Sequence, residues 1–158
     1  VVPFYRHLLA QGKTILPVTH QEMTRFWITL DEGVEFVLTN FKRMQGGEIF
    51  VPKIPSVHIL DLVEAMSGTR ECELIGIRPG EKLHEVMVPE EMAHHSLEFD
   101  DHFVITPSIK FFDKTIDYSK NKLGEMGNKV SEKFEYHSGT NQHFLSIDDL
   151  KAMDKQTL

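Results

Sequence analysis

The chain has 158 residues, of which 41% are hydrophobic and 26% charged, and its formal net charge is -7. These values suit a globular domain with its own core. The acidic balance argues against nucleic acid and anionic lipid, since both need a basic face, and no apolar run approaches the roughly 20 residues of a membrane span. The single cysteine, Cys72, excludes an internal disulfide and favours a cytoplasmic location.

The first 28 residues predict a helix followed by two short strands. Pro3 suits the first turn of the helix, and Gly12 ends it. Residues 15–19 predict a short strand, and Pro17 favours an edge position for it because proline has no N–H to donate. Residues 26–28 predict a second short extended run.

Residues 29–43 form the clearest predicted helix. Thr29 and Glu32 have the spacing of a capping box, and Gly46 and Gly47 end the helix. Its apolar residues share one face: they are Leu30, Val34, Val37, Leu38, Phe41 and Met44.

The rest of the chain predicts alternating strands and helices, with rising polarity from about residue 111. Ser56 is the predicted cap of a helix that ends at Gly68. The other predicted elements are a strand over 48–52, a strand over 74–77, a short helix or extended piece over 81–88, a strand over 103–107 and a last helix containing Ser146, Asp149, Leu150 and Met153.

Arg25 is a candidate ligand for a phosphate group. It precedes the short run 26–28, and a guanidinium offers a planar fork of donors. The alternative is a surface arginine paired with Asp31 or Glu32, and taken alone this alternative is the commoner arrangement.

The segment Arg78-Pro79-Gly80-Glu81 is a second candidate site. Arg78 stands at the carboxyl end of a predicted strand, where open α/β sheets bind ligands. Arg78 could hold a diphosphate, and Glu81 could accept hydrogen bonds from sugar hydroxyls. A polar turn with an Arg–Glu ion pair explains the same residues equally well.

Three further patterns have ordinary structural explanations. The edge at Pro17, Val18 and Thr19 offers backbone groups to a planar base, although an ordinary edge strand needs no ligand. The nine histidines are scattered, which argues against a metal site. Tyr118 and Lys122 have the Tyr-x-x-x-Lys spacing of short-chain dehydrogenases, but no dinucleotide fingerprint precedes them, so the spacing is interpreted as chance.

Four segments in order resemble the UDP-N-acetylglucosamine 4,6-dehydratase (inverting) family of extended short-chain dehydrogenase/reductase proteins. They read VVPFY over 1–5, MTRFWITLDEGV over 23–34, GGEIFVPKIPS over 46–56 and GIRPGEKLHE over 76–85. The resemblance covers roughly residues 1–107. It implies an α/β fold that forms the C-terminal substrate-binding part of such a protein, with the N-terminal Rossmann half absent.

The resemblance also implies a domain organisation. Residues 1–110 would form a sugar-nucleotide-binding region with elements that pack on the missing Rossmann half, and residues 111–158 a polar C-terminal extension. The chain opens on Val1 rather than Met, as expected of a piece of a longer protein. Without the Rossmann half, the helix over 29–43 should expose apolar surface.

By the same resemblance, the full-length protein would be an NADP-dependent lyase of bacterial pseudaminic acid or surface-polysaccharide biosynthesis. It would oxidise C4 of UDP-N-acetylglucosamine, eliminate water across C5 and C6, return hydride to C6 and invert C5. NADP would be bound by the N-terminal half. The protein would be cytoplasmic and homo-oligomeric, and this part alone would be inactive.

Carried over by position, the resemblance assigns substrate-binding roles only. Arg25 and Arg78 would bind the diphosphate, and Glu81 would bind the ribose or order Arg78. Pro17, Val18 and Thr19 would line the uracil. No residue of this chain is expected to be catalytic, cofactor-binding or metal-ligating. The alternatives are a non-catalytic nucleotide-sugar-binding module and a related UDP-sugar epimerase or retaining dehydratase.

Overall fold

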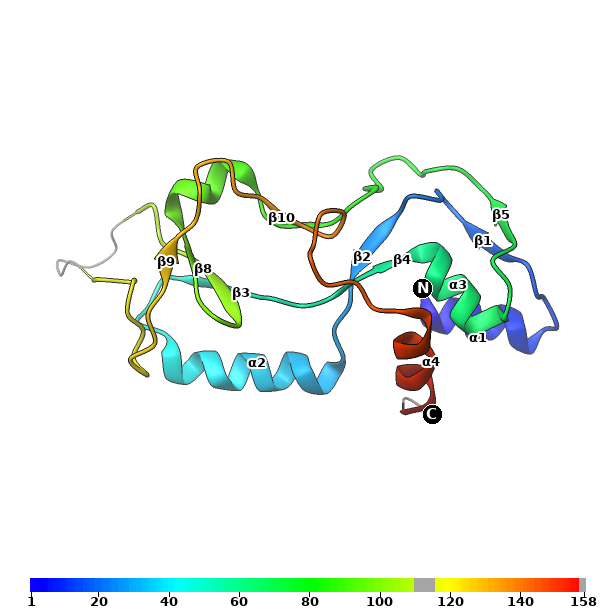
Figure 1. Ribbon diagram of the computed structural model, residues 1–158, viewed down its shortest axis with the longest axis horizontal. Helices are drawn as coiled ribbons and strands as arrows, with labels where there is room; N and C mark the ends of the chain where they lie inside the picture. The colour runs from blue at the N-terminus through cyan, green and yellow to red at the C-terminus, as the bar shows by residue number, and fades with distance from the viewer. Residues whose placement is uncertain (110–115, 157–158) are drawn as a thin grey trace. The chain divides into compact units, whose positions relative to one another are not determined.

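The computed structural model of the chain describes residues 1–109 and 116–156 (Figure 1). The chain divides into two compact units whose segments alternate along the sequence. Unit 1 comprises Val1–Trp27, Pro55–Glu85 and Ser138–Leu158, and unit 2 comprises Ile28–Ile54 and Val86–His137. Residues beyond 110 therefore contribute to both units, while the functional division at residue 110 stays a prediction.

Unit 1 contains two strand pairs and three helices. β1 pairs with β5 in parallel, and β2 pairs with β4 antiparallel. Helix α3 packs against α1, α4 and β1 (Figure 1). The elements are α1 (Val2–Ala10), β1 (Leu16–Val18), β2 (Thr24–Phe26), β4 (Ser56–His58), α3 (Ile59–Ser67), β5 (Cys72–Leu74) and α4 (Ile147–Gln156).

The helices of unit 1 follow their local signals at most ends. Pro3 lies in the first turn of α1, and Gly12 follows the helix with φ +82°. Helix α3 ends at Gly68, whose φ of +78° is the left-handed C-cap conformation. Ser146 and Asp149 cap α4 reciprocally: the Ser146 N–H donates to the Asp149 carboxylate at 2.9 Å, and the Asp149 N–H donates to Ser146 Oγ at 3.2 Å.

The predicted start of α3 was wrong. Ser56 does not cap the helix but lies in β4, opposite Phe26 of β2. Its hydroxyl is buried and accepts a hydrogen bond from Asn141 at 3.0 Å. The helix begins at Ile59 after His58. Strand pairing and the bond to a distant residue thus override the local preference of serine for a helix cap.

Two strand predictions were shifted. The run predicted over 26–28 is β2, Thr24–Phe26, and the strand predicted over 74–77 is β5, Cys72–Leu74. β5 ends early because Gly76 turns the chain with φ +81°. Of the two alternatives for 81–88, the extended one is confirmed, with β6 at Val86–Val88.

Unit 2 contains one long helix and an antiparallel sheet with strand order β3-β8-β7-β9. β6 pairs separately with β10. The core of the sheet is made by Leu97, Phe99 and Val104. The elements are α2 (Leu30–Arg43), β3 (Ile49–Pro52), β6 (Val86–Val88), the 3-10 helix η1 (Glu90–His95), β7 (Ser96–Glu98), β8 (His102–Ile105), β9 (Asn128–Lys129) and β10 (Tyr136–His137).

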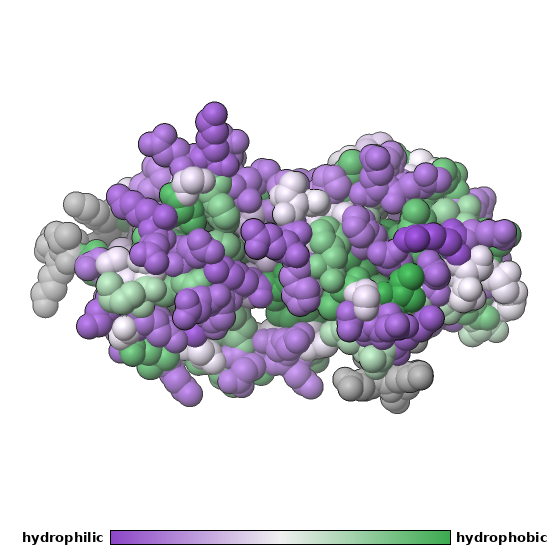
Figure 2. Space-filling view, viewed as in Figure 1, coloured by the Kyte–Doolittle hydropathy of each residue, from purple (hydrophilic) through white to green (hydrophobic). Residues whose placement is uncertain are grey.

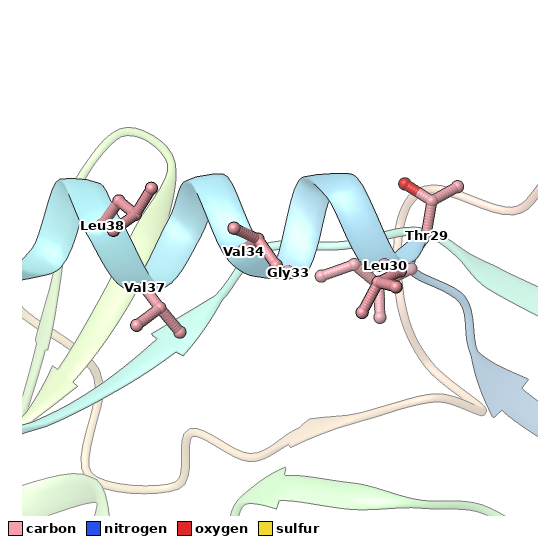
Figure 3. Close-up of a pocket in the computed structure, with 7 residues that line it drawn as sticks. Thr29, Leu30, Gly33, Val34, Val37 and Leu38 are labelled. Atoms are coloured by element: carbon pink, nitrogen blue, oxygen red, sulfur yellow. The ribbon is translucent and has the colours of Figure 1, made fainter.

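Helix α2 confirms both its predicted cap and its predicted exposure. Thr29 and Glu32 form the capping box, with the Thr29 N–H donating to Glu32 at 2.8 Å. Leu30 is 82% exposed and Phe41 64% exposed. A shallow groove along the helix is lined by Ile28, Thr29, Leu30, Gly33, Val34, Val37 and Leu38 (Figure 3).

Polar side chains cover most of the molecular face drawn in Figure 2, with hydrophobic ones in smaller patches between them. The run of exposed apolar side chains along α2 is longer in sequence than such isolated patches require. Leu30, Val34 and Val37 recur at successive turns of α2 (Figure 3). Little of this apolar face of α2 is buried against the rest of unit 2.

A buried arginine holds three segments of unit 2 together. The Arg43 side chain, 7% exposed, donates to Glu125 at 2.7 and 3.1 Å and to Asp101 at 2.9 Å. Its carbonyl accepts the N–H of Lys122 at 3.0 Å. Asp101 in turn accepts from the wholly buried His102 at 2.6 Å. Arg43 thereby joins the end of α2 to the β7–β8 turn and to the loop before β9.

Three groups of this cluster have lowered pKa values, for different reasons. Hydrogen bonds from Arg43 lower the pKa of Glu125. Burial would raise the pKa of Asp101, but hydrogen bonds from His102 and Arg43 outweigh it and lower that pKa. Burial lowers the pKa of His102, against the opposing bond to Asp101. His102 is therefore held in its neutral form within the core of unit 2.

Replacing Arg43 should destabilise the protein. Arg43→Ala leaves Asp101 and Glu125 without their main counter-charge, and we expect a loss of about 2 kcal/mol in the free energy of unfolding, since both acids are half exposed and partly solvated. Urea denaturation measures it. The matched control is Arg70→Ala, which removes an exposed ion pair with Asp61 and should cost under about 1 kcal/mol. Equal losses in both variants would contradict this role of Arg43.

The depressed pKa of His102 predicts a loss of stability in acid. As pH falls through about 6.5, the unfolded chain gains a proton that the folded chain does not accept until lower pH, so folding becomes less favourable. His102→Gln should remove this component between about pH 7.5 and about pH 5.5. The test compares urea midpoints across that range, with the exposed His7→Gln as control. An unchanged pH dependence in His102→Gln would count against the assignment.

Candidate functional site

Two parallel strands of unit 1 end at a common edge. Val18 of β1 lies opposite Leu74 of β5, and the next residue, Ile75, donates its N–H to the Val18 carbonyl at 2.9 Å. Figure 1 shows β1 and β5 side by side. The segment that begins at Thr19 and the segment that leads to Arg78 therefore leave the sheet at the same end. The carboxyl ends of parallel strands are where α/β proteins bind ligands.

The segment Arg78-Pro79-Gly80-Glu81 forms a tight turn. The Glu81 N–H donates to the Arg78 carbonyl at 3.0 Å. Pro79 stands at the second position and Gly80, with φ +82°, at the third, as a type II turn requires. The Glu81 carboxylate also accepts the Arg78 N–H at 3.2 Å. The turn exposes the Arg78 side chain, and Glu81 orders the Arg78 backbone.

Arg25 lies on β2 and faces this turn. Its guanidinium donates to the carbonyls of Thr24, at 2.7 Å, and Leu83, at 3.3 Å. Its ion-pair partners are Glu85 at 3.4 Å and Glu81 at 3.8 Å. The structure thus brings Arg25 and Glu81 together. The alternative prediction, that Arg25 pairs with Asp31 or Glu32, is wrong, because its partners Glu81 and Glu85 lie about 60 residues downstream.

The ion pairs of Arg25 are loose. Distances of 3.4 and 3.8 Å exceed those of a charge-assisted hydrogen bond. The Arg25 side chain is 21% exposed, so solvent screens both pairs and each contributes little to stability. An anion with better geometry can therefore displace either carboxylate from the guanidinium. Together with the exposed Arg78, Arg25 offers two cations at one turn.

The backbone groups at the end of β1 are mostly in use. The Pro17 carbonyl accepts the Tyr5 hydroxyl at 2.9 Å, and burial raises the pKa of Tyr5 to about 12, so that hydroxyl keeps its proton. The Val18 carbonyl binds Ile75, and the Val18 side chain is buried in the core. Thr19 donates its hydroxyl to the sulfur of Met23 at 3.2 Å. Contact of Val18 with a ligand would have to come through its backbone.

A buried polar network lies behind Arg25, and no sequence pattern indicated it. Thr24 Oγ1 lies 2.7 Å from Ser138 Oγ and 2.8 Å from His84 Nδ1. Thr24 and Ser138 are 114 residues apart, and neither belongs to a short motif. Only the packing of the segment that begins at Ser138 within unit 1 brings them together.

Tyr118 and Lys122 do not share a helix face. Tyr118 donates its hydroxyl to the Gly46 carbonyl at 2.8 Å, and the segment carrying both residues is not helical. The interpretation of their spacing as chance stays a prediction. Within residues 1–109 and 116–156, no three His, Cys, Asp or Glu side chains converge in a way that would hold a metal ion.

Among the helices in the described part of the chain, none combines the length and the apolar character needed to cross a bilayer.

Comparison with known proteins agrees with the motifs. Residues 1–107 match the family described as polysaccharide biosynthesis protein. The UDP-N-acetylglucosamine 4,6-dehydratase (inverting) of Campylobacter jejuni is 51% identical over 99% of this chain and 47% of its own length. The capsular polysaccharide biosynthesis protein CapD of Staphylococcus aureus is 32% identical over 82% of this chain and 24% of its own. The predicted resemblance is therefore confirmed.

The fold is also shared with a solved structure. Pen from Bacillus thuringiensis superposes with a TM-score of 0.74 over 100% of this chain and 46% of that one, at 24% identity. That match confirms the predicted α/β fold, which here corresponds to part of a longer protein. The chain spans about half the length of the relatives that it matches most fully.

Motifs, identity and the match over residues 1–107 agree: the chain belongs to the polysaccharide biosynthesis protein family.

Proposed function

We propose that this chain forms the UDP-binding part of a UDP-N-acetylglucosamine 4,6-dehydratase that inverts C5. The observation that carries the proposal is the assembly of Arg25, Glu81 and the Arg78 turn at the carboxyl edge of β1 and β5. Two arginines at one turn suit a diphosphate, which accepts forked donors. The 51% identity to the Campylobacter jejuni enzyme supports the substrate.

The proposal gives each residue of the site one task. Arg78 and Arg25 neutralise the diphosphate, with Arg25 exchanging its loose carboxylate partners for phosphate oxygens. Glu81 keeps the turn in shape through the Arg78 N–H, which favours its ordering role over direct contact with the ribose. Pro17, Val18 and Thr19 border the uracil, with Thr19 the first residue beyond the β1–β5 edge.

The chemical step belongs to residues outside this sequence. The Gly-x-Gly-x-x-Gly fingerprint, by which a Rossmann domain binds a dinucleotide, does not occur in the 158 residues. NADP, bound elsewhere in the full-length protein, would supply hydride acceptance and return. The contribution of this chain is to hold the UDP end of the substrate so that the sugar is presented in a fixed orientation.

We extend the proposal to a wider biological role. We place the full-length protein in the cytoplasm as a homo-oligomeric lyase of surface-polysaccharide or pseudaminic acid biosynthesis. The alternative activity is UDP-sugar epimerisation, because the UDP-glucose 4-epimerase of Rickettsia conorii is 29% identical over 97% of this chain. A dehydratase releases a 4-keto-6-deoxy sugar nucleotide, whereas an epimerase releases a product of unchanged mass.

Removing Arg78 should weaken UDP binding by the full-length protein. Arg78→Ala deletes one of two cations on the diphosphate, and we expect the dissociation constant of UDP-N-acetylglucosamine to rise at least about tenfold, or roughly 1.4 kcal/mol. The affinity for UDP alone should fall by the same factor, because Arg78 would contact the diphosphate that UDP and UDP-N-acetylglucosamine share. Isothermal titration calorimetry measures both.

The matched control is Arg70→Ala. Arg70 is also an exposed arginine of unit 1, but it pairs with Asp61 on α3. Its loss should leave the dissociation constant unchanged. Unchanged UDP affinity in Arg78→Ala would exclude the diphosphate role and leave a non-catalytic module, or another ligand, to be considered.

A further inference from the structure

We propose that Thr24, Ser138 and His84 are positioning residues, which hold the loop 81–85 against β2 and so set the geometry of Arg25 for the diphosphate. The inference rests on the proposed function and deepens it. It assigns a role in substrate binding to residues 138–139, a segment that the sequence analysis placed in the polar C-terminal extension and outside the binding region.

Ser138 holds the loop at two points. Its N–H donates to the Glu85 carbonyl at 2.8 Å, and its Oγ accepts the Glu85 N–H at 2.9 Å. Ser138 is 0% exposed, so water does not compete for either bond. The backbone of Glu85, whose carboxylate pairs with Arg25, is therefore fixed from the C-terminal segment.

Thr24 extends the network to the strand that carries Arg25. The Ser138 hydroxyl, which accepts the Glu85 N–H, can also donate to Thr24 Oγ1 at 2.7 Å. Thr24 can then donate to His84 Nδ1 at 2.8 Å in the tautomer that carries its hydrogen on Nε2. Thr24 is 1% exposed and Ser138 0% exposed. Neither hydroxyl can reach a substrate, so their role is positional.

The contact between the loop 81–85 and β2 also orients the guanidinium of Arg25. The Leu83 carbonyl accepts the Thr24 N–H at 3.1 Å and Arg25 Nη1 at 3.3 Å. The Thr24 carbonyl accepts Arg25 Nη1 at 2.7 Å. If the loop 81–85 moves away from Thr24, Arg25 loses Leu83, and the carboxylates of the loop move with it.

Gly139 completes the arrangement by leaving room for His84. A Cβ at this position would lie 2.7 Å from two atoms of the His84 ring. That separation is below any normal contact, so a side chain at Gly139 would displace His84 from Thr24. Ser138 therefore binds the backbone of Glu85, and Gly139 fits closely against the neighbouring side chain of the loop, His84.

The test uses the full-length protein with UDP and UDP-N-acetylglucosamine. Thr24→Val keeps the shape of the side chain but removes the hydroxyl, and Thr24→Ser keeps the hydroxyl. Ser138→Ala removes the Oγ bonds to Glu85 and Thr24 and keeps the backbone bond to the Glu85 carbonyl. We expect Thr24→Val and Ser138→Ala to raise the dissociation constant of UDP and the KM by about tenfold with kcat within about twofold. Thr24→Ser should restore affinity to within about twofold of wild type.

The matched control is Ser56→Ala. Ser56 is also 0% exposed, and its replacement by alanine also removes a side-chain hydrogen bond, here the one donated by Asn141 rather than one to the loop 81–85. Its melting temperature should fall about as far as that of Ser138→Ala, while its UDP affinity stays at the wild-type value. A shared loss of affinity in Ser56→Ala would mean that general destabilisation explains the effect and would overturn the inference.

The two proposals fail separately. If Arg78→Ala loses affinity while Ser138→Ala and Thr24→Val bind UDP as wild type does, the network is purely structural and only this inference is overturned. If Arg78→Ala also binds as wild type does, the proposed function fails first. Should Thr24→Val not fold, Ser138→Ala and the comparison of wild type with Thr24→Ser carry the test.

Discussion

The alternation of side chains along β2 is the constraint on which the candidate site depends. Successive residues of a strand point to opposite faces. Thr24 is buried and bonds to Ser138 and His84, while the next residue, Arg25, is partly exposed and faces the acids of the loop. One strand position anchors the loop, and the following position presents the cation that the loop surrounds. A shift of one residue in the β2–β4 register would exchange these two roles.

Electrostatics explains how the partly exposed Arg25 and the exposed Arg78 keep donors available at one turn. Arg25 shares its charge with Glu81 and Glu85 at distances too long for strong bonds. Glu81 holds the Arg78 backbone through a hydrogen bond rather than pairing with its guanidinium. The carboxylates therefore keep the turn ordered and leave the cations available. Arg43 in unit 2 is the opposite case, because it is buried, bound to both its acids at hydrogen-bond distance and committed to structure.

The apolar face of α2 shows how strongly local sequence can determine an element whose apolar side chains are not buried by its own unit. The capping box at Thr29 and the spacing of apolar residues each favour an α-helix without any tertiary contact. The helix forms although Leu30 and Phe41 remain exposed. An exposed apolar run of this length is typical of a surface that is covered by other protein.

Local signals in the sequence determined the helices, the cap of α2, the left-handed end of α3 at Gly68 and the turn at Pro79-Gly80, because each depends on residues within a few positions of one another. The motifs around Arg25 and Arg78 were visible for the same reason. Tertiary structure alone decided that Ser56 joins a strand, and that Arg25 pairs with Glu81 and Glu85 rather than with its neighbours. It alone also placed Ser138 behind Thr24. These outcomes depend on contacts between residues up to 114 positions apart, and a single sequence carries no local pattern for such contacts.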